Sequence, residues 1–265
     1  MGGPGDPHLP CEWRLGHTAP VYSDDDAAAL YDLLNPWEPS DDFYLSCVLT
    51  ASSALDVGCG TGRLLHRARE AGHGGRLCGV DPDPAALARA RRRDDVEWVQ
   101  GRAADMTFAR EFDLAVMASN VFQVFVTDEE LRGSLAATRA ALVPDGRLVL
   151  GTRNPRVRAW EGWNPANPID VVDHRGRELR ILYQVEAVAG DVVAFTETTA
   201  TRDGRPLRVD RASLRFLDVD GVAAALAGAG FQVAAWYGDW SRGPLTGKSD
   251  NIVVVAVAVE EPHGG

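Results

Sequence analysis

The sequence predicts an α/β protein with a doubly wound sheet, an N-terminal helical cap and an inserted antiparallel β meander. Three patterns indicate this class. Short apolar segments alternate with helix-like segments between residues 50 and 154, period-two alternation takes over from 169 to 216, and the α/β pattern resumes up to residue 259. Because apolar strands separated by helices form parallel sheets covered on both faces, the first and third stretches are expected to build one core.

The N-terminal region is expected to hold a tail and two helices. Residues 1–18 are rich in Gly and Pro, and we expect a disordered tail there. Residues 19–49 are the predicted helical cap, in which Ser23 caps a helix with three acids in its first turn. Asn35-Pro36 ends that helix, and a second one follows over about Asp41 to Leu49.

The predicted core covers residues 50–154 and 212–259. The strands of its first part are ALDVG, RLCGVD, VEWVQG, FDLAVMAS and GRLVLGTRN. The helices between them are GRLLHRAREAG, DPAALARARRR and TDEELRGSLAATRAALV, the last capped by Thr127. Right-handed crossovers between such strands give a doubly wound fold. The second part supplies the helix DVDGVAAALAGAGF and the strands QVAAWYGDW and NIVVVAVAV.

Residues 155–211 are the predicted insertion. Three stretches with alternating polarity fall in or just beyond it, RELRILYQVEAV, DVVAFTETTATRD and RPLRVDRASLRF, with turn signals between them. A meander of this size is too small to stand alone. We therefore expect it to pack over the edge or the mouth of the main sheet.

Composition excludes several classes of protein. The net charge of −11 disfavours a nucleic-acid partner, since phosphate binders carry a basic footprint. No apolar run reaches the length needed to span a bilayer. The four cysteines show no CxxC spacing, so we expect neither a metal site nor a disulfide framework, and a cytoplasmic location fits best.

A glycine-rich turn follows the first core strand, in the stretch LDVGCGTGRL. Such a turn can hold a dinucleotide, a triphosphate or a ligand without phosphate. A triphosphate loop needs a Lys that is missing here, and the dinucleotide spacing GxGxxG differs from the GxGxG of Gly58, Gly60 and Gly62. The preceding acid, Asp56, would repel phosphate but suits a ligand with an ammonium group.

Acids at the next two strand ends complete the pattern. Asp81 ends the second strand, where an acid can accept both hydroxyls of a ribose. Asp105 follows the third strand and could accept from the exocyclic amine of adenine, while Met106 packs on the ring. Together these acids and the glycine turn describe a pocket for a cationic nucleoside with an amino-acid tail, which is S-adenosylmethionine.

The segments LDVGCGTGRLL, GVDPDPAALARAR, GRAADM, FDLAVMASNVFQVF and LVPDGRLVL resemble the class I S-adenosylmethionine-dependent methyltransferases. The resemblance runs from about residue 50 to 152 and resumes at about 212–259. It implies a seven-stranded sheet of order 3-2-1-4-5-7-6 with strand 7 antiparallel, and S-adenosylhomocysteine as product. It also implies these cofactor-binding residues: Tyr31, Asp56, Gly58, Gly60, Gly62, Asp81, Pro82, Asp105, Met106, Ala118 and Ser119.

The acceptor of the methyl group is expected at the carboxyl ends of the strands. The substrate candidates there are Asn120, Phe122, Arg153, Trp160, Trp163 and Tyr237. The catalytic candidates are Asn120, Arg153 and Tyr44. In the family that this chain resembles, many members have His at the position of Asn120, and Asn cannot take up a proton near neutral pH. This departure favours an acceptor that is already deprotonated, such as a free amine, or a changed reaction.

The leading hypothesis is thus a small-molecule methyltransferase of secondary metabolism, with N- or O-methylation undecided. The alternative is an enzyme of the same fold that binds the cofactor but catalyses a non-methylating reaction such as cyclisation. A non-catalytic partner subunit ranks last, because the cofactor motifs are complete. The meander resembles an extension of small-molecule N-methyltransferases, including those acting on nucleotide-linked amino sugars, and we expect it to serve as a lid or in a homodimer.

Overall fold

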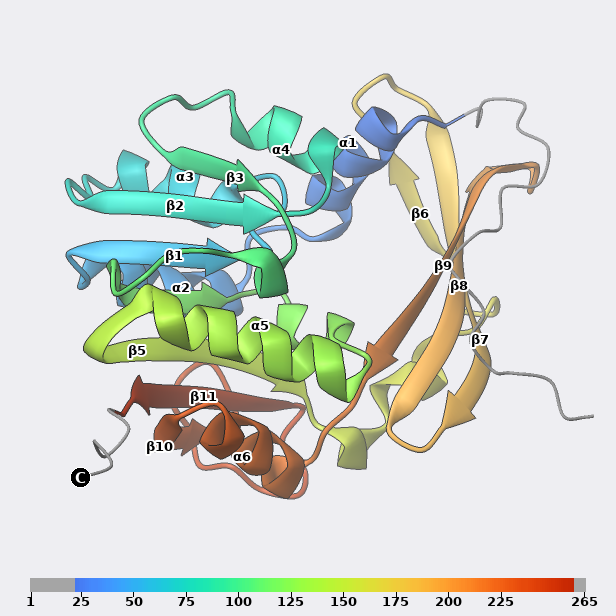
Figure 1. Cartoon of the computed structure of the whole chain (residues 1–265). Helices are drawn as coiled ribbons and strands as arrows, with labels where there is room; N and C mark the ends of the chain where they lie inside the picture. Colours follow the sequence, from blue (N-terminus) through green and yellow to red (C-terminus); the bar gives the residue numbers. More distant parts are fainter. Residues whose placement is uncertain (1–21, 260–265) are drawn as a thin grey trace, which may run out of the picture.

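The computed structural model describes residues 22–259, which form two sheets (Figure 1). The larger sheet has the strand order β10-β11-β5-β4-β1-β2-β3. Its strands are β1 (Ser53–Val57), β2 (Arg76–Asp81), β3 (Glu97–Gln100), β4 (Phe112–Met117), β5 (Leu142–Arg153), β10 (Phe231–Tyr237) and β11 (Asn251–Ala258). β11 is antiparallel to both of its neighbours and the strands from β1 to β5 pair in parallel, which confirms the predicted order and the reversed seventh strand.

Helices cover both faces of this sheet, as apolar strands require. They are α1 (Asp24–Leu34), α2 (Pro39–Leu49), α3 (Arg63–Glu70), α4 (Pro84–Ala90), α5 (Asp128–Ala141) and α6 (Val219–Gly228). Short 3₁₀ turns span Ala103–Asp105, Val121–Val124, Pro155–Val157 and Ala159–Gly162. Leu55 of β1 packs in a core cluster with residues of α5 and α6, whereas Ala54 packs in a second cluster with residues of α2 and α3. No helix within residues 22–259 has the length and apolarity to cross a membrane.

The second sheet is antiparallel, with the order β6-β7-β8-β9. Its strands are β6 (Ile169–Val172), β7 (Glu178–Ala189), β8 (Val192–Thr201) and β9 (Pro206–Arg215). The sequence predicts only the last three, because β6 is four residues long and almost wholly exposed. β9 also runs past residue 211, where we expected the insertion to end. The predicted tail, residues 1–18, lies outside the described residues.

The four-stranded sheet stands across the ends toward which β1, β2 and β3 point, and α1 lies between it and α4 (Figure 1). Ser23 is the N-cap of α1, and its side chain accepts from the Asp26 N–H, as predicted. Leu30 of α1 joins an apolar cluster with Leu179 and Ile181 of β7. Two sheets and a helix thus meet at the edge where a doubly wound fold binds its ligands.

A buried ion pair fixes α1 to the second sheet. Asp26 exposes 3% of its surface and lies 3.0 Å from an Arg175 nitrogen and 3.1 Å from an Arg177 nitrogen. Both arginines belong to the turn between β6 and β7. Burial opposes ionisation of Asp26, but the hydrogen bond and charge of Arg177 outweigh it and lower the pKa of this carboxyl.

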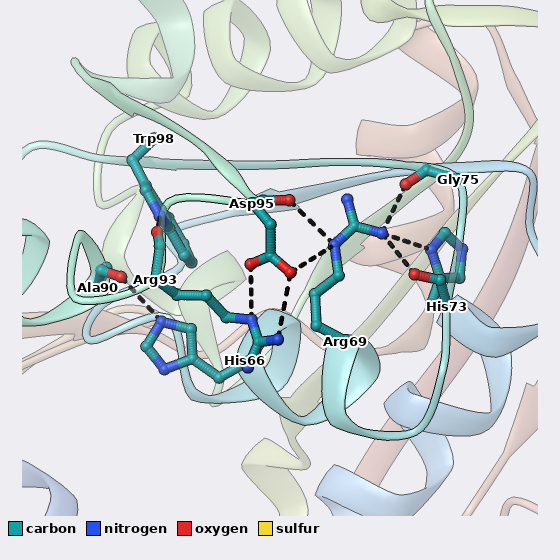
Figure 2. A network of polar contacts seen from close by, with 8 residues as sticks. All are labelled: His66, Arg69, His73, Gly75, Ala90, Arg93, Asp95 and Trp98. Carbon is teal, nitrogen blue, oxygen red and sulfur yellow. Dashed lines mark hydrogen bonds and ion pairs between the residues drawn. The ribbon is translucent and has the colours of Figure 1, made fainter.

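Polar contacts also hold α3 and β3 in place (Figure 2). Arg69 of α3 donates to the carbonyls of Gly75 (2.7 Å) and Asp95 (3.0 Å), and the Asp95 carboxylate pairs with Arg93 at 2.7 Å. The Arg93 carbonyl in turn accepts from the Trp98 indole at 2.9 Å. The network therefore sets the position of the Trp98 ring, which packs beneath the glycine turn described below.

We predict that Asp26→Asn lowers the free energy of unfolding by about 2 kcal/mol at pH 7, because a buried carboxylate loses its pairing with two partly exposed arginines, of which Arg177 keeps Asp173 as a partner. The exposed neighbour Asp25→Asn is the matched control and should cost less than about 1 kcal/mol. Since the folded-state pKa of Asp26 is lowered, its contribution is present above the unfolded-state pKa and is lost as the pH falls. Urea unfolding at pH 7 and at pH 3 measures both effects, and equal losses for the two variants would contradict the prediction.

Candidate functional site

An unpartnered carboxylate lies at the carboxyl end of β1. Asp56 exposes 2% of its surface, and its Oδ1 atom has no hydrogen-bond partner within the described chain. Burial, together with the charges of Asp81 and Asp41, raises its pKa to about 7. Buried polar groups are nearly always paired. This one fits a ligand that brings a donor or a positive charge.

The three glycines that follow have positive φ for different physical reasons. A Cβ on Gly58 (φ +75°) would lie 2.6 Å from Val121, and one on Gly62 (φ +78°) would collide with Trp98. Gly60 (φ +54°) instead has no atom within 4 Å of its Cβ position. The outer two glycines are therefore required by packing, whereas the middle one borders open space that a ligand can approach closely.

Asp81 at the end of β2 is oriented by the backbone of the same turn. Its Oδ2 accepts from the Gly60 N–H at 2.8 Å and its Oδ1 from the Asp83 N–H at 2.9 Å. A carboxylate offers about four lone-pair sites, so two remain for ribose hydroxyls. Pro82 is exposed beside it, and Asp83 caps α4.

The ends of β3 and β4 contribute the other predicted cofactor residues. Asp105 is exposed at the end of its 3₁₀ turn, and Met106 is half-buried against the core. After β4, half-buried Ala118 leads into Ser119 (φ 50°) and Asn120 (φ 61°), two consecutive non-glycine residues in the left-handed region. Such backbone costs about 1–3 kcal/mol per residue and clusters at ligand sites.

These residues fit S-adenosylmethionine. The side chains of Asp56 and Asp81 are acceptors that suit an ammonium group and hydroxyls, and their charge opposes a phosphate. Gly60 leaves room for the ligand. The exposed carboxylate of Asp105 follows β3, which is two strands away from β1 in the sheet. Within residues 22–259, no group of three His, Cys, Asp or Glu side chains is arranged to hold a metal ion.

The helical cap is joined to the glycine turn directly. Thr61 donates to Asp32 of α1 at 2.6 Å, and Arg89 of α4 lies 3.4 Å from the same carboxylate. A cavity of about 570 Å³ opens beside this junction, on the side of α3 and α4. The Asp32 contacts position α1, and with it Tyr31, over the edge of the sheet.

Arg153 and Tyr31 lie together on the acceptor side. Arg153 ends β5, donates to Gln123 Oε1 at 3.1 Å and places its guanidinium 5.5 Å from the centre of the Trp163 ring. Tyr31 exposes 45% of its surface, and Ser119 and Arg153 lie near enough to lower the pKa of its hydroxyl, although burial gives a net rise. Burial lowers the pKa of Arg153, while the nearby phenol of Tyr31 opposes that shift.

Four of the acceptor-side candidates lie in packed surroundings. The Tyr44 hydroxyl is buried and donates to the Met117 carbonyl. Phe122 lies in the main core, where it is 2% exposed. Trp160 packs edge-on against Phe216, with ring centres 4.5 Å apart, and therefore serves packing. The fourth is Tyr237, which packs on Phe43 of α2 rather than with Arg153.

Gln123, Tyr183 and Glu197 also bear on the site, and sequence reasoning missed the last two. Gln123 is fully buried and links β5 to β9, since its amide donates to the Arg215 carbonyl at 3.1 Å. Tyr183 of β7 lies directly opposite Glu197 of β8. The sequence did contain one signal for this part of the site. Glu197 is a charged residue on the same side of β8 as Val193 and Thr199, which are buried.

We predict that Gly60→Ala lowers the affinity for S-adenosylhomocysteine by about 10-fold or more, because the new methyl group fills the space left for the ligand. Gly72→Ala is the matched control, since Gly72 also has positive φ (+89°) and open space at its Cβ position. Both variants should lose about 1 kcal/mol of stability for the left-handed backbone. Calorimetric titration checks the prediction, and equal affinity for the two variants would refute it.

The pKa of Asp56 gives a second prediction. Because the folded state raises this pKa to about 7, the ligand-free protein loses stability as the pH rises from about 4 through 7. Asp56→Asn should therefore raise the free energy of unfolding by about 2–4 kcal/mol at pH 8 and by almost nothing at pH 4. The same change should weaken S-adenosylhomocysteine binding. Denaturant titrations of the ligand-free protein at both pH values provide the measurement, and a pH-independent difference would count against it.

Comparison with known proteins agrees with this geometry. A family model described as a methyltransferase domain matches residues 54–146. The cypemycin N-terminal methyltransferase of a Streptomyces species is 28% identical over 195 residues, which cover 68% of this chain and 78% of that protein. The dTDP-3-amino-3,4,6-trideoxy-alpha-D-glucopyranose N,N-dimethyltransferase of Streptomyces venezuelae is 33% identical over 136 residues, 48% of this chain and 52% of that protein.

A solved structure shows the same fold. S-adenosylmethionine-bound CalS10, an amino pentose methyltransferase from Micromonospora echinaspora involved in calicheamicin biosynthesis, superposes with a TM-score of 0.65 at 24% identity, covering 92% of this chain and 100% of that one. The glycine turn with its two acids lies inside the matched domain, and the strand order is the one that the resemblance implies. Residues 54–146 therefore match a methyltransferase domain, and the chain has the fold of a solved S-adenosylmethionine-bound methyltransferase.

Proposed function

We propose that this enzyme methylates an amine nitrogen of a small molecule of secondary metabolism. The observation that carries the proposal is the side-chain set around Arg153 and Tyr31. His66, His73 and His174 all lie elsewhere, against Ala90, Ala51 and Asp26 respectively, so the described chain offers no histidine there to deprotonate a hydroxyl. An amine loses its proton far more readily than an alcohol. The names of the three relatives above, each an N-terminal, N,N-dimethyl or amino pentose methyltransferase, support the same acceptor class.

The site residues fall into two groups, one on the cofactor side and one on the acceptor side. Asp56, Gly60 and Asp81 would hold the cofactor, and Asp105 and Ser119 would border it. When bound, S-adenosylmethionine supplies a methyl group on a positively charged sulfur that leaves as a neutral thioether. Asn120 and Arg153 would orient the acceptor by hydrogen bonds, and Trp163 would cover it. The second sheet and α1 would shield the approach from water, which matters because positioning in a site without bulk water accounts for most of such a displacement.

The alternative of a non-methylating reaction receives no support from the relatives, whose names are all those of methyltransferases. Asn120, the residue that suggested it, is equally consistent with an amine acceptor that needs no histidine base. Methyl transfer is therefore retained as the reaction.

Location and assembly belong to the same proposal. A cytoplasmic setting is supported by Cys47, Cys59 and Cys78, which are buried free thiols. A homodimer through the second sheet is supported by exposed apolar side chains on its two edge strands, namely Ile169, Val172 and Val209. The acidic net charge supports a partner other than nucleic acid.

The proposal is tested with three acceptors of known chemistry: the dTDP-linked amino sugar that the Streptomyces venezuelae relative is named for, a short peptide with a free N-terminal amine, and the hydroxyl analogue of the sugar. We expect one or both amines to gain a methyl group, with one S-adenosylhomocysteine released per methyl, and the hydroxyl analogue to stay unchanged. Mass spectrometry measures all three. Methylation of the hydroxyl analogue alone would overturn the proposal.

A further inference from the structure

We propose that Glu197 of β8 binds the ammonium group of the acceptor and takes up the proton that this group loses before methylation. The inference rests on the proposed function, since it requires an amine acceptor. It assigns a role to a side chain that lies outside the methyltransferase domain of residues 54–146.

Glu197 lies on the inner face of the second sheet. Its neighbour on the same face, Phe195, packs on Trp163 with ring centres 4.9 Å apart, and Trp163 lies against the guanidinium of Arg153. Thr196, one residue away, points to the outer face, where it hydrogen bonds to the exposed Glu186 at 3.1 Å. The alternation of a strand therefore places Glu197 toward the acceptor side of the core.

Apolar clusters flank this position on both sides. One cluster joins Leu30 of α1 to Ile181 of β7, with Tyr183 packed against it. The other joins Trp160, Val193 and Phe216. A carboxylate between two apolar clusters is costly unless something compensates its charge.

The described protein supplies no cation of its own for that charge. Glu197 is in no ion pair within residues 22–259, and Arg208, whose charge acts on it, is already held at 2.6 Å by Asp210 and at 2.6 Å by Asp24 of α1. Burial raises the pKa of Glu197, the Tyr183 hydroxyl lowers it, Asp210 raises it and Arg208 lowers it, with a net rise. An ammonium group would provide the missing positive charge.

Glu197 also lies toward the edge of the main sheet at which the cofactor would bind. Tyr183, which faces Glu197 across the β7–β8 pair, is close enough to Arg153 and Tyr31 to feel their charges. Arg153 ends β5, and Tyr31 reaches Ser119 after β4. Glu197 thus lies on the side of the second sheet that faces Tyr31 and Arg153.

The proton balance of the step is simple. The acceptor ammonium gives one proton to a Glu197 carboxylate oxygen and becomes a neutral amine. The nitrogen lone pair then forms the bond to the methyl carbon while the carbon–sulfur bond breaks and its electron pair stays on sulfur. Glu197 afterwards releases the proton to water. A carboxyl whose pKa lies above its usual range is better matched to this transfer than an ordinary one.

The test compares Glu197→Gln with Glu186→Gln, the same change on the outer face of the same sheet. With the amine that the wild type methylates, we expect Glu197→Gln to lower kcat about 100-fold at pH 7, whereas Glu186→Gln stays at the wild-type value. The rate of Glu197→Gln should climb between pH 8 and 10, as the amine loses its proton in solution. Affinity for S-adenosylhomocysteine and the melting temperature should match the wild type in both variants.

A binding measurement gives a readout that does not depend on turnover. Calorimetric titration of the same amine into the S-adenosylhomocysteine complex, in buffers of different ionisation enthalpy, counts protons exchanged on binding. We expect the number of protons exchanged on binding to be the same for the wild type and Glu186→Gln, and to differ for Glu197→Gln. If Glu197→Gln keeps the wild-type rate, pH profile and proton count, the inference fails and the proposed function stands. If the wild type binds S-adenosylhomocysteine but methylates neither amine, both fail.

Discussion

The carboxylate of Asp56 is buried at the end of β1 without a partner, and the arrangement of the site follows from that single uncompensated charge. The ligand that removes the penalty must be cationic or donate hydrogen bonds, which excludes phosphates from the same turn. The turn itself is confined by Val121 behind Gly58 and by Trp98 behind Gly62, so its path is set by packing rather than by the ligand. Open space remains at Gly60, next to the N–H that orients Asp81. The backbone is therefore preorganised before a cofactor arrives.

Stability and binding are linked through the same residues. A buried acid with a pKa of about 7 and the left-handed Ser119 and Asn120 each cost folding free energy in the ligand-free protein. The rest of the fold must offset these costs. Two polar contacts need no ligand for this: the pairing of buried Asp26 with two arginines, and the Arg69 network at the amino ends of β2 and β3 (Figure 2). Ligand binding then raises the free energy of unfolding and offsets part of these costs, since a ligand that binds only the folded state stabilises it.

The sequence was sufficient for the core, and it marked the glycine turn, because both depend on local rules. Apolar strands between helices specify the doubly wound sheet, and the spacing of Gly58, Gly60, Gly62 and the acids marks the turn. The acceptor side depends on which distant segments meet. Trp160 and Trp163 look alike in the sequence, yet Trp160 packs on Phe216 whereas Trp163 lies against Arg153. Glu197 becomes informative only when the second sheet is placed across the strand ends, and β6 was missed because four exposed residues carry no periodic signal.

Two positive charges have to meet in an amine methyltransferase, the sulfonium of the donor and the ammonium of the acceptor. In water they repel weakly, but the repulsion grows in an interior of low dielectric constant. Carboxylates on both sides of the site can compensate these charges: Asp56 lies under the glycine turn and Glu197 on the second sheet. Neither of them forms an ion pair within residues 22–259. In the proposed reaction the ligand beside Asp56 stays cationic, whereas Glu197 accepts a proton and returns it in every cycle. This difference explains why Asp56 can be sealed into the core, while Glu197 lies on a separate sheet at the acceptor side.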